Sequence, residues 1–432
     1  MSDDATMRDY VSNELDQREQ TGHDVAALRQ EAAADLDQDQ LADLLARIEA
    51  APRRSFGYHE PDELTAIEAE FADDPDEVPA FVSADRLLAA WRGRVAGNML
   101  GKPVEWGVYW TRARLREYLE AAGAYPLTDY VPAPAGLRER YELRADNWEQ
   151  TTRGRVHGSC RDDDVDYTIL GLHLLEKYGH DFTTQDVAEE WLLRLPYHQT
   201  YTAERAAYRN LIEEIPAEQA ARRRNPYREW IGALIRADIF GYVNPGRPDL
   251  AAKQAYRDAR LSHVGNGIYG EQWAAALTAS ALVADSVRQA FDRSVTYIPQ
   301  RSRLREAVAV VTRIHDDGGT WEEALADADR RWAGYHWVHT VNNAAVIAAA
   351  LLWGDGDFTR SIALTVQGGL DTDSNGATVG SVVGAVLGTA GIPAHWTDPL
   401  EDTVRSAVFG FDGVHISDLA RRTERLAAAR VS

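Results

Sequence analysis

Cysteine and lysine are both scarce in this sequence of 432 residues. The single cysteine, Cys160, excludes an internal disulfide and any zinc cluster built from several cysteines. Lysine occurs only at Lys102, Lys177 and Lys253, although arginine is abundant. Basic residues number 46 against 68 acidic ones, which gives a formal net charge of −22. Because nucleic-acid phosphates require basic patches, we do not expect a nucleic-acid partner.

Long apolar runs are also missing. The longest, at residues 341–353 and 377–387, fall short of the roughly 20 residues that span a bilayer, so both are expected to be buried helices. The first ten residues, MSDDATMRDY, are acidic and contain no apolar run, so no signal peptide is expected. These observations predict a cytoplasmic protein with no membrane partner.

Helical spacing of apolar residues runs through almost the whole chain. It is clearest at residues 84–100, 165–177, 184–195, 272–290, 303–315 and 341–352, and alternating β-branched runs are scarce. We therefore predict an all-α fold. The acidic, proline-bearing stretch ADDPDEVP at 72–79 is typical of a linker. It separates a predicted helical N-terminal extension, residues 1–80, from a compact multi-helix catalytic domain, residues 81–432.

The first acidic cluster is Asp162, Asp163, Asp164 and Asp166, directly before an amphipathic segment. Clustered carboxylates repel one another unless cations or solvent neutralise them. A helix N-terminus also favours anions, so an acidic cap with no metal explains this cluster equally well.

A second acidic cluster lies in GGLDTDSN, at residues 368–375. The two glycines permit a turn in which Asp371 and Asp373 face one point before the next helix begins. Carboxylates with a hydroxyl from Ser374 are oxygen ligands, which suit Mg²⁺ or Mn²⁺. Gly376, Gly380 and Gly384 follow at four-residue spacing, which favours close approach of another helix.

A third element, GRVAGNMLGKPVE at 93–105, spaces small residues in the same way and ends in Glu105. Together, in order, GRVAGNMLGKPVE, DDDVDYT and GGLDTDSN resemble the signature of ADP-ribosylglycohydrolases, such as ADP-ribosyl-dinitrogen-reductase hydrolases. A fourth segment, LSHVGNGIYGE at 261–271, resembles the histidine- and glycine-containing substrate loop of that family. The resemblance covers roughly residues 84–396.

The resemblance implies a role for each matched residue. Glu105 and Asp164 correspond to catalytic carboxylates, and Glu105 would approach the scissile ribose. The implied metal ligands are Asp162, Asp163, Asp164, Asp371, Asp373 and Ser374, holding two Mg²⁺ ions, with Mn²⁺ as an alternative. The implied substrate contacts are His263, Gly265, Gly267 and Tyr269.

Three positions depart from the family pattern. Asp162 replaces a threonine ligand, Val165 replaces a second threonine, and Asn98 stands where aspartate is common. No core carboxylate is lost, so an intact metal site is expected, while the ADP-ribosyl-protein substrate is in doubt.

The resemblance implies hydrolysis of a ribosyl bond. Its transition state is a cation-like sugar, and two ions 3.5–4 Å apart can hold ribose hydroxyls and acidify a water while a carboxylate moves the proton. The expected partner is a ribosyl or ADP-ribosyl small molecule or a modified protein, with arginine, serine, a nucleobase or an amide as leaving group.

Two alternatives remain. Asp162, Asp163 and Asp166 also fit the D-D-x-x-D motif of terpenoid-type all-α enzymes, although their second motif is missing. The second alternative is a protein with the same fold that binds ADP-ribose or a nucleotide without catalysing a reaction. The N-terminal extension is expected to adjust access or assembly, unless Tyr58 or His59 reaches into the cleft.

Overall fold

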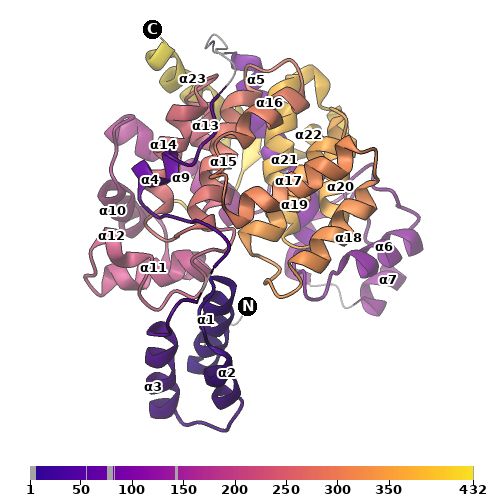
Figure 1. Cartoon of the computed structure of the whole chain (residues 1–432). Coiled ribbons are helices and arrows are strands. Elements are labelled where there is room, and N and C mark those ends of the chain that lie inside the picture. Colours follow the sequence, from indigo (N-terminus) through magenta and orange to yellow (C-terminus); the bar gives the residue numbers. More distant parts are fainter. Residues whose placement is uncertain (1–5, 55, 75–80, 82, 142–144, 432) are drawn as a thin grey trace.

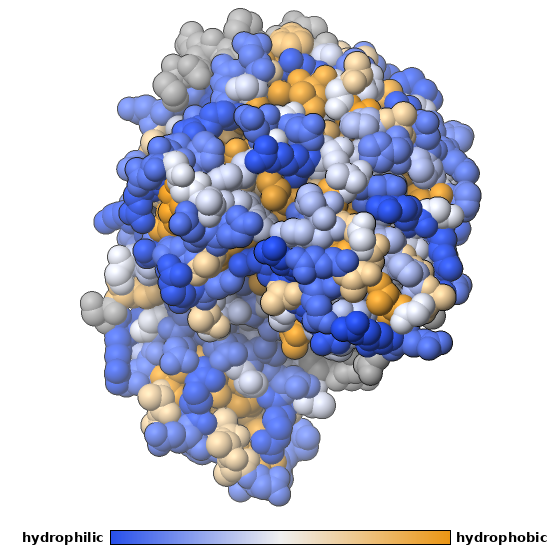
Figure 2. Space-filling model, turned by 90° about the vertical axis from the view of Figure 1, so that its right-hand side faces the viewer, coloured by the Kyte–Doolittle hydropathy of each residue, from blue (hydrophilic) through white to orange (hydrophobic). Residues whose placement is uncertain are grey.

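The fold is almost wholly helical, as predicted. A computed structural model describes residues 6–54, 56–74, 81, 83–141 and 145–431 (Figure 1). In these ranges the chain forms helices α1 to α23 and a single antiparallel pair, β1 (Thr403–Val404) with β2 (Val414–His415). Within the same ranges no helix is both long and apolar enough to cross a membrane. The face in Figure 2 is mostly hydrophilic, with apolar side chains in small scattered groups.

Three N-terminal helices project from the main body (Figure 1). They are α1 (Met7–Gln20), α2 (Ala26–Ala32) and α3 (Gln38–Glu49). Reciprocal side-chain caps begin two of them, with Thr6 and Asp9 at α1 and Asp37 and Gln40 at α3. Their facing sides bury a separate apolar cluster that includes Val11, Leu15, Leu41, Leu44, Leu45 and Ile48. The prediction of a helical N-terminal extension is confirmed for these helices.

Buried polar contacts fasten the N-terminal segment to the main body. Glu14 on α1 pairs with Arg228 at 2.6 Å. Further along the chain, Glu60 pairs with the buried Arg303 at 2.7 Å. The short helix α4 (Leu64–Glu68) follows, and the described part of this segment ends at residue 74. Arg303 also pairs with Glu229. Most of the expected linker, residues 75–79, and the expected boundary near residue 80 lie outside the described residues.

A chain that begins at Ser83 is expected to melt well below the full-length protein. Its buried Arg303 and Arg228 would lose Glu60 and Glu14, and breaking a buried ion pair typically costs about 3–5 kcal/mol. Thermal unfolding of both proteins measures the difference. The control is Glu31→Gln in the full-length chain, which breaks only an exposed pair with Arg47 and should leave the melting temperature almost unchanged. Equal melting temperatures for the shortened and full-length chains would contradict this interpretation.

The centre of the main body is the contact between α5 (Ala84–Gly101) and α21 (Thr372–Leu387). A Cβ added at Gly97 would lie 1.9 Å from the Gly376 carbonyl oxygen, and one at Gly93 would lie 2.1 Å from that of Gly380. The two glycine series predicted from the sequence are therefore the two sides of one backbone-to-backbone contact. Since Thr372 Oγ1 donates to the Gly101 carbonyl at 2.9 Å, the helices run antiparallel and the end of α5 meets the start of α21.

Other buried helices surround this pair. They are α9 (Asp163–Tyr178), α13 (Asp238–Tyr242), α15 (Asn266–Ala281), α19 (Thr340–Trp353) and α20 (Phe358–Gln367). Outer helices are α6 (Arg112–Ala121), α7 (Ala135–Arg140), α8 (Ala145–Thr151), α10 (Thr184–Arg194), α11 (Thr202–Ile212), α12 (Ala217–Ala220), α14 (Pro248–Ala259), α16 (Val287–Val295), α17 (Arg303–Asp316), α18 (Trp321–Arg331), α22 (Ala394–Thr397) and α23 (Ile416–Val431). Five short 3₁₀ turns complete the described structure: η1 (Lys102–Val104), η2 (Tyr197–Gln199), η3 (Leu234–Arg236), η4 (Thr389–Gly391) and η5 (Asp398–Leu400).

One predicted helix is wrong in its extent. Residues 272–290 were expected to form a single helix, but α15 ends at Ala281 and α16 begins at Val287. Ser286 separates them by accepting a hydrogen bond from Gln289 N, because a serine side chain satisfies the free N–H groups of a new helix.

Candidate active site

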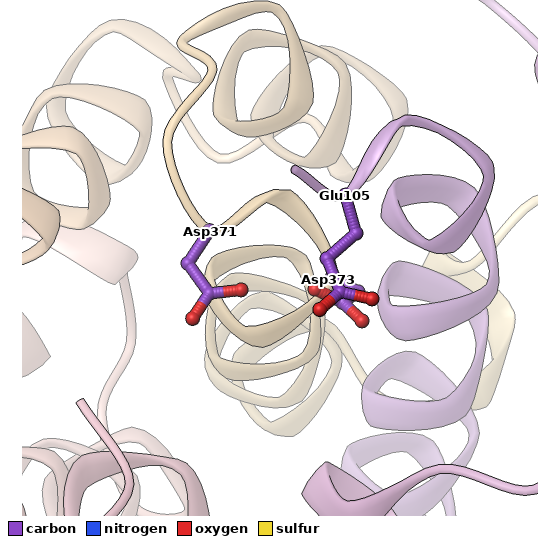
Figure 3. A group of neighbouring side chains, drawn as sticks. All are labelled: Glu105, Asp371 and Asp373. Atoms are coloured by element: carbon purple, nitrogen blue, oxygen red, sulfur yellow. The ribbon is translucent and has the colours of Figure 1, made fainter. Parts of the chain in front are cut away.

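Three helix ends bring the acidic residues of the sequence to one cavity of about 450 Å³. Glu105 follows α5 and η1, a cluster of aspartates begins α9, and another begins α21. The cavity wall contains Glu105, Asp162, Asp163, Asp164, Asp371, Asp373 and Ser374. Figure 3 shows Glu105, Asp371 and Asp373 together beside the first turn of α21. Asp163 and Asp164 at the start of α9 therefore meet Asp371 and Asp373 at the start of α21 in one cavity.

The turn before α21 directs its carboxylates into the cavity. Gly369 has a φ of 72° and Leu370 a φ of 62°, so the chain reverses through the left-handed region. Asn343 on α19 then fixes the helix start, because its Oδ1 accepts from Asp371 N at 3.1 Å and from Asn375 Nδ2 at 2.7 Å. The predicted turn is present.

The start of α9 is held by side chains from α5. Asp162 caps α9 by accepting from Asp164 N at 3.1 Å. Asn98 Nδ2 donates to Asp162 Oδ1 at 3.0 Å and to Asp164 Oδ2 at 2.9 Å. Below them, the buried Arg94 donates to the Asp164 carbonyl at 2.6 Å and pairs with Asp238. The helix cap and a cavity-facing carboxylate cluster therefore coexist at this helix end.

Among the residues that the structure describes, two groups of three carboxylates have oxygen atoms close enough to share a cation. Glu105, Asp371 and Asp373 form the first group, and Asp162, Asp164 and Asp373 form the second, each with its oxygens within 4.8 Å of one another. Because the donors are all oxygens and mostly buried, they fit Mg²⁺ or Mn²⁺. Asp373 belongs to both groups.

The other two predicted ligands have different positions. Asp163 lines the cavity but belongs to neither group, and Ser374 Oγ donates to Asp164 Oδ1 at 3.0 Å. Their assignment as metal ligands stays a prediction.

Burial and mutual repulsion change the acidity of the cluster. Burial, reinforced by Glu105, raises the pKa of Asp373 to about 8. Burial first, and neighbouring aspartates second, also raise the pKa values of Asp164 and Asp371 well above the ordinary value. Burial acts in the same direction on Asp162, but the adjacent Lys102 ammonium outweighs it and holds that pKa below its ordinary value. A cation entering the cluster must therefore displace protons.

Divalent-cation affinity is expected to rise with pH up to about 8. The raised pKa of Asp373 favours its protonated form below about pH 8 in the metal-free protein, and each proton displaced on binding changes the affinity about tenfold per pH unit. The same shift makes the metal-free protein lose stability as pH rises from about 4 towards 8, because the folded state binds the proton more tightly than the unfolded state. Calorimetric titration with Mn²⁺ at pH 6, 7 and 8, in two buffers, measures affinity and proton release. An affinity independent of pH over this range would contradict the shifted pKa.

Aromatic side chains form much of the cavity wall. Trp106, Tyr201, Trp230 and Trp337 line it, and Trp230 stacks on His336 with ring centroids 4.0 Å apart. Such faces can stack a nucleobase. Nothing in the sequence distinguishes these four residues, because tryptophan and tyrosine in an apolar, mostly helical chain are usually core residues.

A missed carboxylate also reaches the cavity. Glu204 on α11 lines the wall, and burial, opposed by the neighbouring Arg236, raises its pKa to about 7. Nothing in the spacing around Glu204 distinguishes it from other glutamates of an acidic chain.

The predicted substrate segment, residues 261–271, lies behind this wall, and it is a loop only up to Gly265, because α15 begins at Asn266. His263 is fully buried, with Nε2 3.9 Å from Glu204 Oε1. Gly265 N donates to Asp62 at 2.8 Å, and Tyr269 OH donates to the Pro61 carbonyl. A Cβ on Gly267 would meet the His263 ring at 2.8 Å. The role of these four residues as direct substrate contacts stays a prediction. Asp62 and Pro61 of the N-terminal segment cover this part of the chain.

Two alternatives can be compared with these positions. Tyr58 donates to Glu306 at 2.6 Å and His59 contacts Glu70, and neither lines the cavity. In the D-D-x-x-D interpretation Asp166 would bind metal, but one of its oxygens accepts from Arg161 and the other from Ser406. The terpenoid-type alternative therefore loses its third ligand.

Known proteins resemble this chain over most of its length. Residues 81–431 match the sequence pattern of the ADP-ribosylglycohydrolase family. An uncharacterised protein of Archaeoglobus fulgidus is 23% identical over 317 residues, which cover 72% of this chain and 90% of that protein. A solved structure described as an ADP-ribosylglycohydrolase-related protein complex is 22% identical, with a TM-score of 0.48, and the match covers 80% of this chain and 98% of the other. The family match spans far more than half of the sequence, and the chain belongs to the ADP-ribosylglycohydrolase family.

Proposed function

We propose that this protein is a Mg²⁺- or Mn²⁺-dependent hydrolase that cleaves the glycosidic bond of an ADP-ribosyl or related ribosyl substrate. Family membership supports a hydrolase of the ADP-ribosyl type. The observation that carries the finer proposal is the meeting of two carboxylate groups, both containing Asp373, at a cavity with aromatic walls. A cavity of about 450 Å³ is in the usual size range of ligand pockets.

Glu105, Asp371 and Asp373 are the residues that would hold a divalent cation. When bound, the cation supplies positive charge for the ribose hydroxyls and makes a bound water more acidic. The resemblance implies two ions, but Lys102 pairs with Glu105, Asp162 and Asp373 and so competes with cations for these oxygens.

The side chains of the cavity provide the remaining functions. Glu105 is partly exposed beside Asp373, so it can exchange a proton with a reacting water or leaving group. The indole faces of Trp106, Trp230 and Trp337 would orient the base and exclude water from the reacting bond. Asp164, held by Asn98 and Ser374, is the second carboxylate proposed to act on the substrate.

A non-catalytic ADP-ribose or nucleotide binder is the second candidate. One observation favours it: Lys102 already pairs with three of the carboxylates, so the cluster is partly neutralised without any ion. Binding of ADP-ribose without Mg²⁺-dependent turnover would support this candidate.

A screen of ribosyl substrates tests the proposal. ADP-ribosyl-arginine, ADP-ribosyl-serine, nucleosides and ribosyl amides are incubated with Mg²⁺ or with a chelator, and mass spectrometry identifies any released group. We expect at least one leaving group to be released only with the cation. Absence of turnover for every class, with ADP-ribose still bound, would reject the hydrolase.

We also propose that the N-terminal extension, up to about residue 80, braces the domain and supplies no catalytic group. Its contacts support this role, because Asp62 and Pro61 accept hydrogen bonds from the loop behind the cavity and Gln17 donates to Glu229 at 2.7 Å.

A further inference from the structure

One of the three lysines of the chain lies inside the carboxylate cluster. Lys102 follows the last residue of α5, and its side chain is 14% exposed. Its Nζ lies 2.5 Å from Asp162 Oδ2, 2.6 Å from Glu105 Oε2 and 2.9 Å from Asp373 Oδ2. Three carboxylates therefore share one ammonium group.

The ammonium contacts both groups of candidate ligands. It pairs with Glu105 and Asp373 of the first group and with Asp162 and Asp373 of the second. An ammonium group donates three hydrogen bonds and carries a fixed single charge, so it can occupy the place of a cation among oxygens. A divalent ion at the same oxygens would be close to it and repelled.

The two groups differ in the oxygens that Lys102 leaves available. Both oxygens of Asp162 are engaged, Oδ2 by Lys102 and Oδ1 by Asn98 Nδ2 and Asp164 N. In the other group, Lys102 contacts one oxygen of Glu105 and one of Asp373 and does not contact Asp371. Asp373 belongs to both groups, and its second oxygen accepts from Ser374 N at 3.1 Å, so the groups differ only at their other members. Because Lys102 leaves Asp371 and one oxygen of Glu105 uncontacted, the group of Glu105, Asp371 and Asp373 is the more open of the two to an ion.

We propose that Lys102 takes the place of one of two divalent cations, so that the protein binds a single ion at Glu105, Asp371 and Asp373. Asp162 then anchors Lys102 instead of binding metal. This role explains why aspartate replaces threonine at position 162, because the Asp162 carboxylate neutralises the buried Lys102 ammonium. The inference rests on the proposed function only in treating this cluster as a metal site.

Manganese stoichiometry tests the proposal without any substrate. Equilibrium dialysis of the full-length protein is expected to give one tightly bound Mn²⁺ per chain, with the electron paramagnetic resonance spectrum of an isolated ion. Lys102→Met removes the charge at similar length and is expected to bind two, with the coupled spectrum of ions about 3.5–4 Å apart. Lys102→Arg keeps the charge and should still bind one.

Two aspartates at matched helix starts provide a second measurement. Asp162→Asn should retain the single Mn²⁺ with an affinity within about threefold, whereas Asp371→Asn should lose it. Two ions in the unaltered protein would overturn the proposal, even if Lys102→Met failed to fold. One ion in a folded Lys102→Met would also overturn it. These outcomes are independent of turnover, so a protein with one ion and no hydrolase activity would reject the proposed function alone.

Discussion

Replacing Asp373 by asparagine is expected to abolish turnover and the rise in melting temperature that Mg²⁺ produces. Asp373 is the carboxylate common to both candidate ligand groups, so its loss affects either arrangement. A ligand at 100 times its Kd stabilises the native state by about 2.7 kcal/mol, and this increment should vanish. Above pH 8 the metal-free variant should be at least as stable as the unaltered protein, because the buried negative charge that Asp373 carries there is gone.

Thermal unfolding with and without Mg²⁺, together with kcat on the substrate found by the screen, measures both effects. Glu218→Gln is the matched control, since Glu218 is an exposed acid on α12 and does not line the cavity. Wild-type turnover in Asp373→Asn would show that the site has been assigned wrongly.

Glu105→Gln is expected to retain the cation and lose about 10²–10⁴-fold in kcat, the usual contribution of a general acid–base group. Glutamine keeps the shape and one oxygen ligand but cannot exchange a proton. Mn²⁺ affinity and kcat, measured on the same preparation, separate the two roles. A decrease in kcat of less than about tenfold would mean that Glu105 has only a structural role. Loss of Mn²⁺ binding would mean that Glu105 acts chiefly as a metal ligand.

The sequence was sufficient to predict the helix starts that carry the acids. Asp162 and Asp371 each precede an apolar segment, so both helices and their N-terminal positions could be expected from local pattern alone. The glycine series on α5 and α21 predicted a close helix contact on each side, although only the structure shows that they meet each other.

Other parts of the site depend on distant packing and gave no local signal. Trp230 and Trp337 are 107 residues apart and belong to loops whose position depends on the helices around them. Lys102 was visible, but its contact with Asp162 depends on how α5 meets α9. Residues 261–271 were expected to form a loop at the substrate, but residues 266–271 begin α15. His263 lies behind Glu204, and Asp62 and Pro61 of the N-terminal segment bond to Gly265 and Tyr269.

Two departures from the family pattern compensate each other in space. Asparagine stands at position 98, where aspartate is common, and aspartate at position 162, where threonine is usual. These two side chains contact each other, because Asn98 Nδ2 donates to Asp162 Oδ1 at 3.0 Å. The pair therefore still contains one carboxylate, which is at position 162 and not at position 98. Returning Asn98 alone to aspartate would place two acids against each other.

The glycine contact between α5 and α21 bears on which ion the site accepts. The end of α5 and the start of α21 are set by carbonyl groups resting against glycine backbones, with no side chain between them to change its rotamer. The separation of these two helix ends is therefore stiff. Mg²⁺ binds oxygen at about 2.0–2.1 Å and Ca²⁺ at about 2.3–2.6 Å, so the larger ion would require the helix ends to move apart. We therefore expect the site to bind Mg²⁺ or Mn²⁺ in preference to Ca²⁺ because of ionic radius, even though carboxylates bind all three ions.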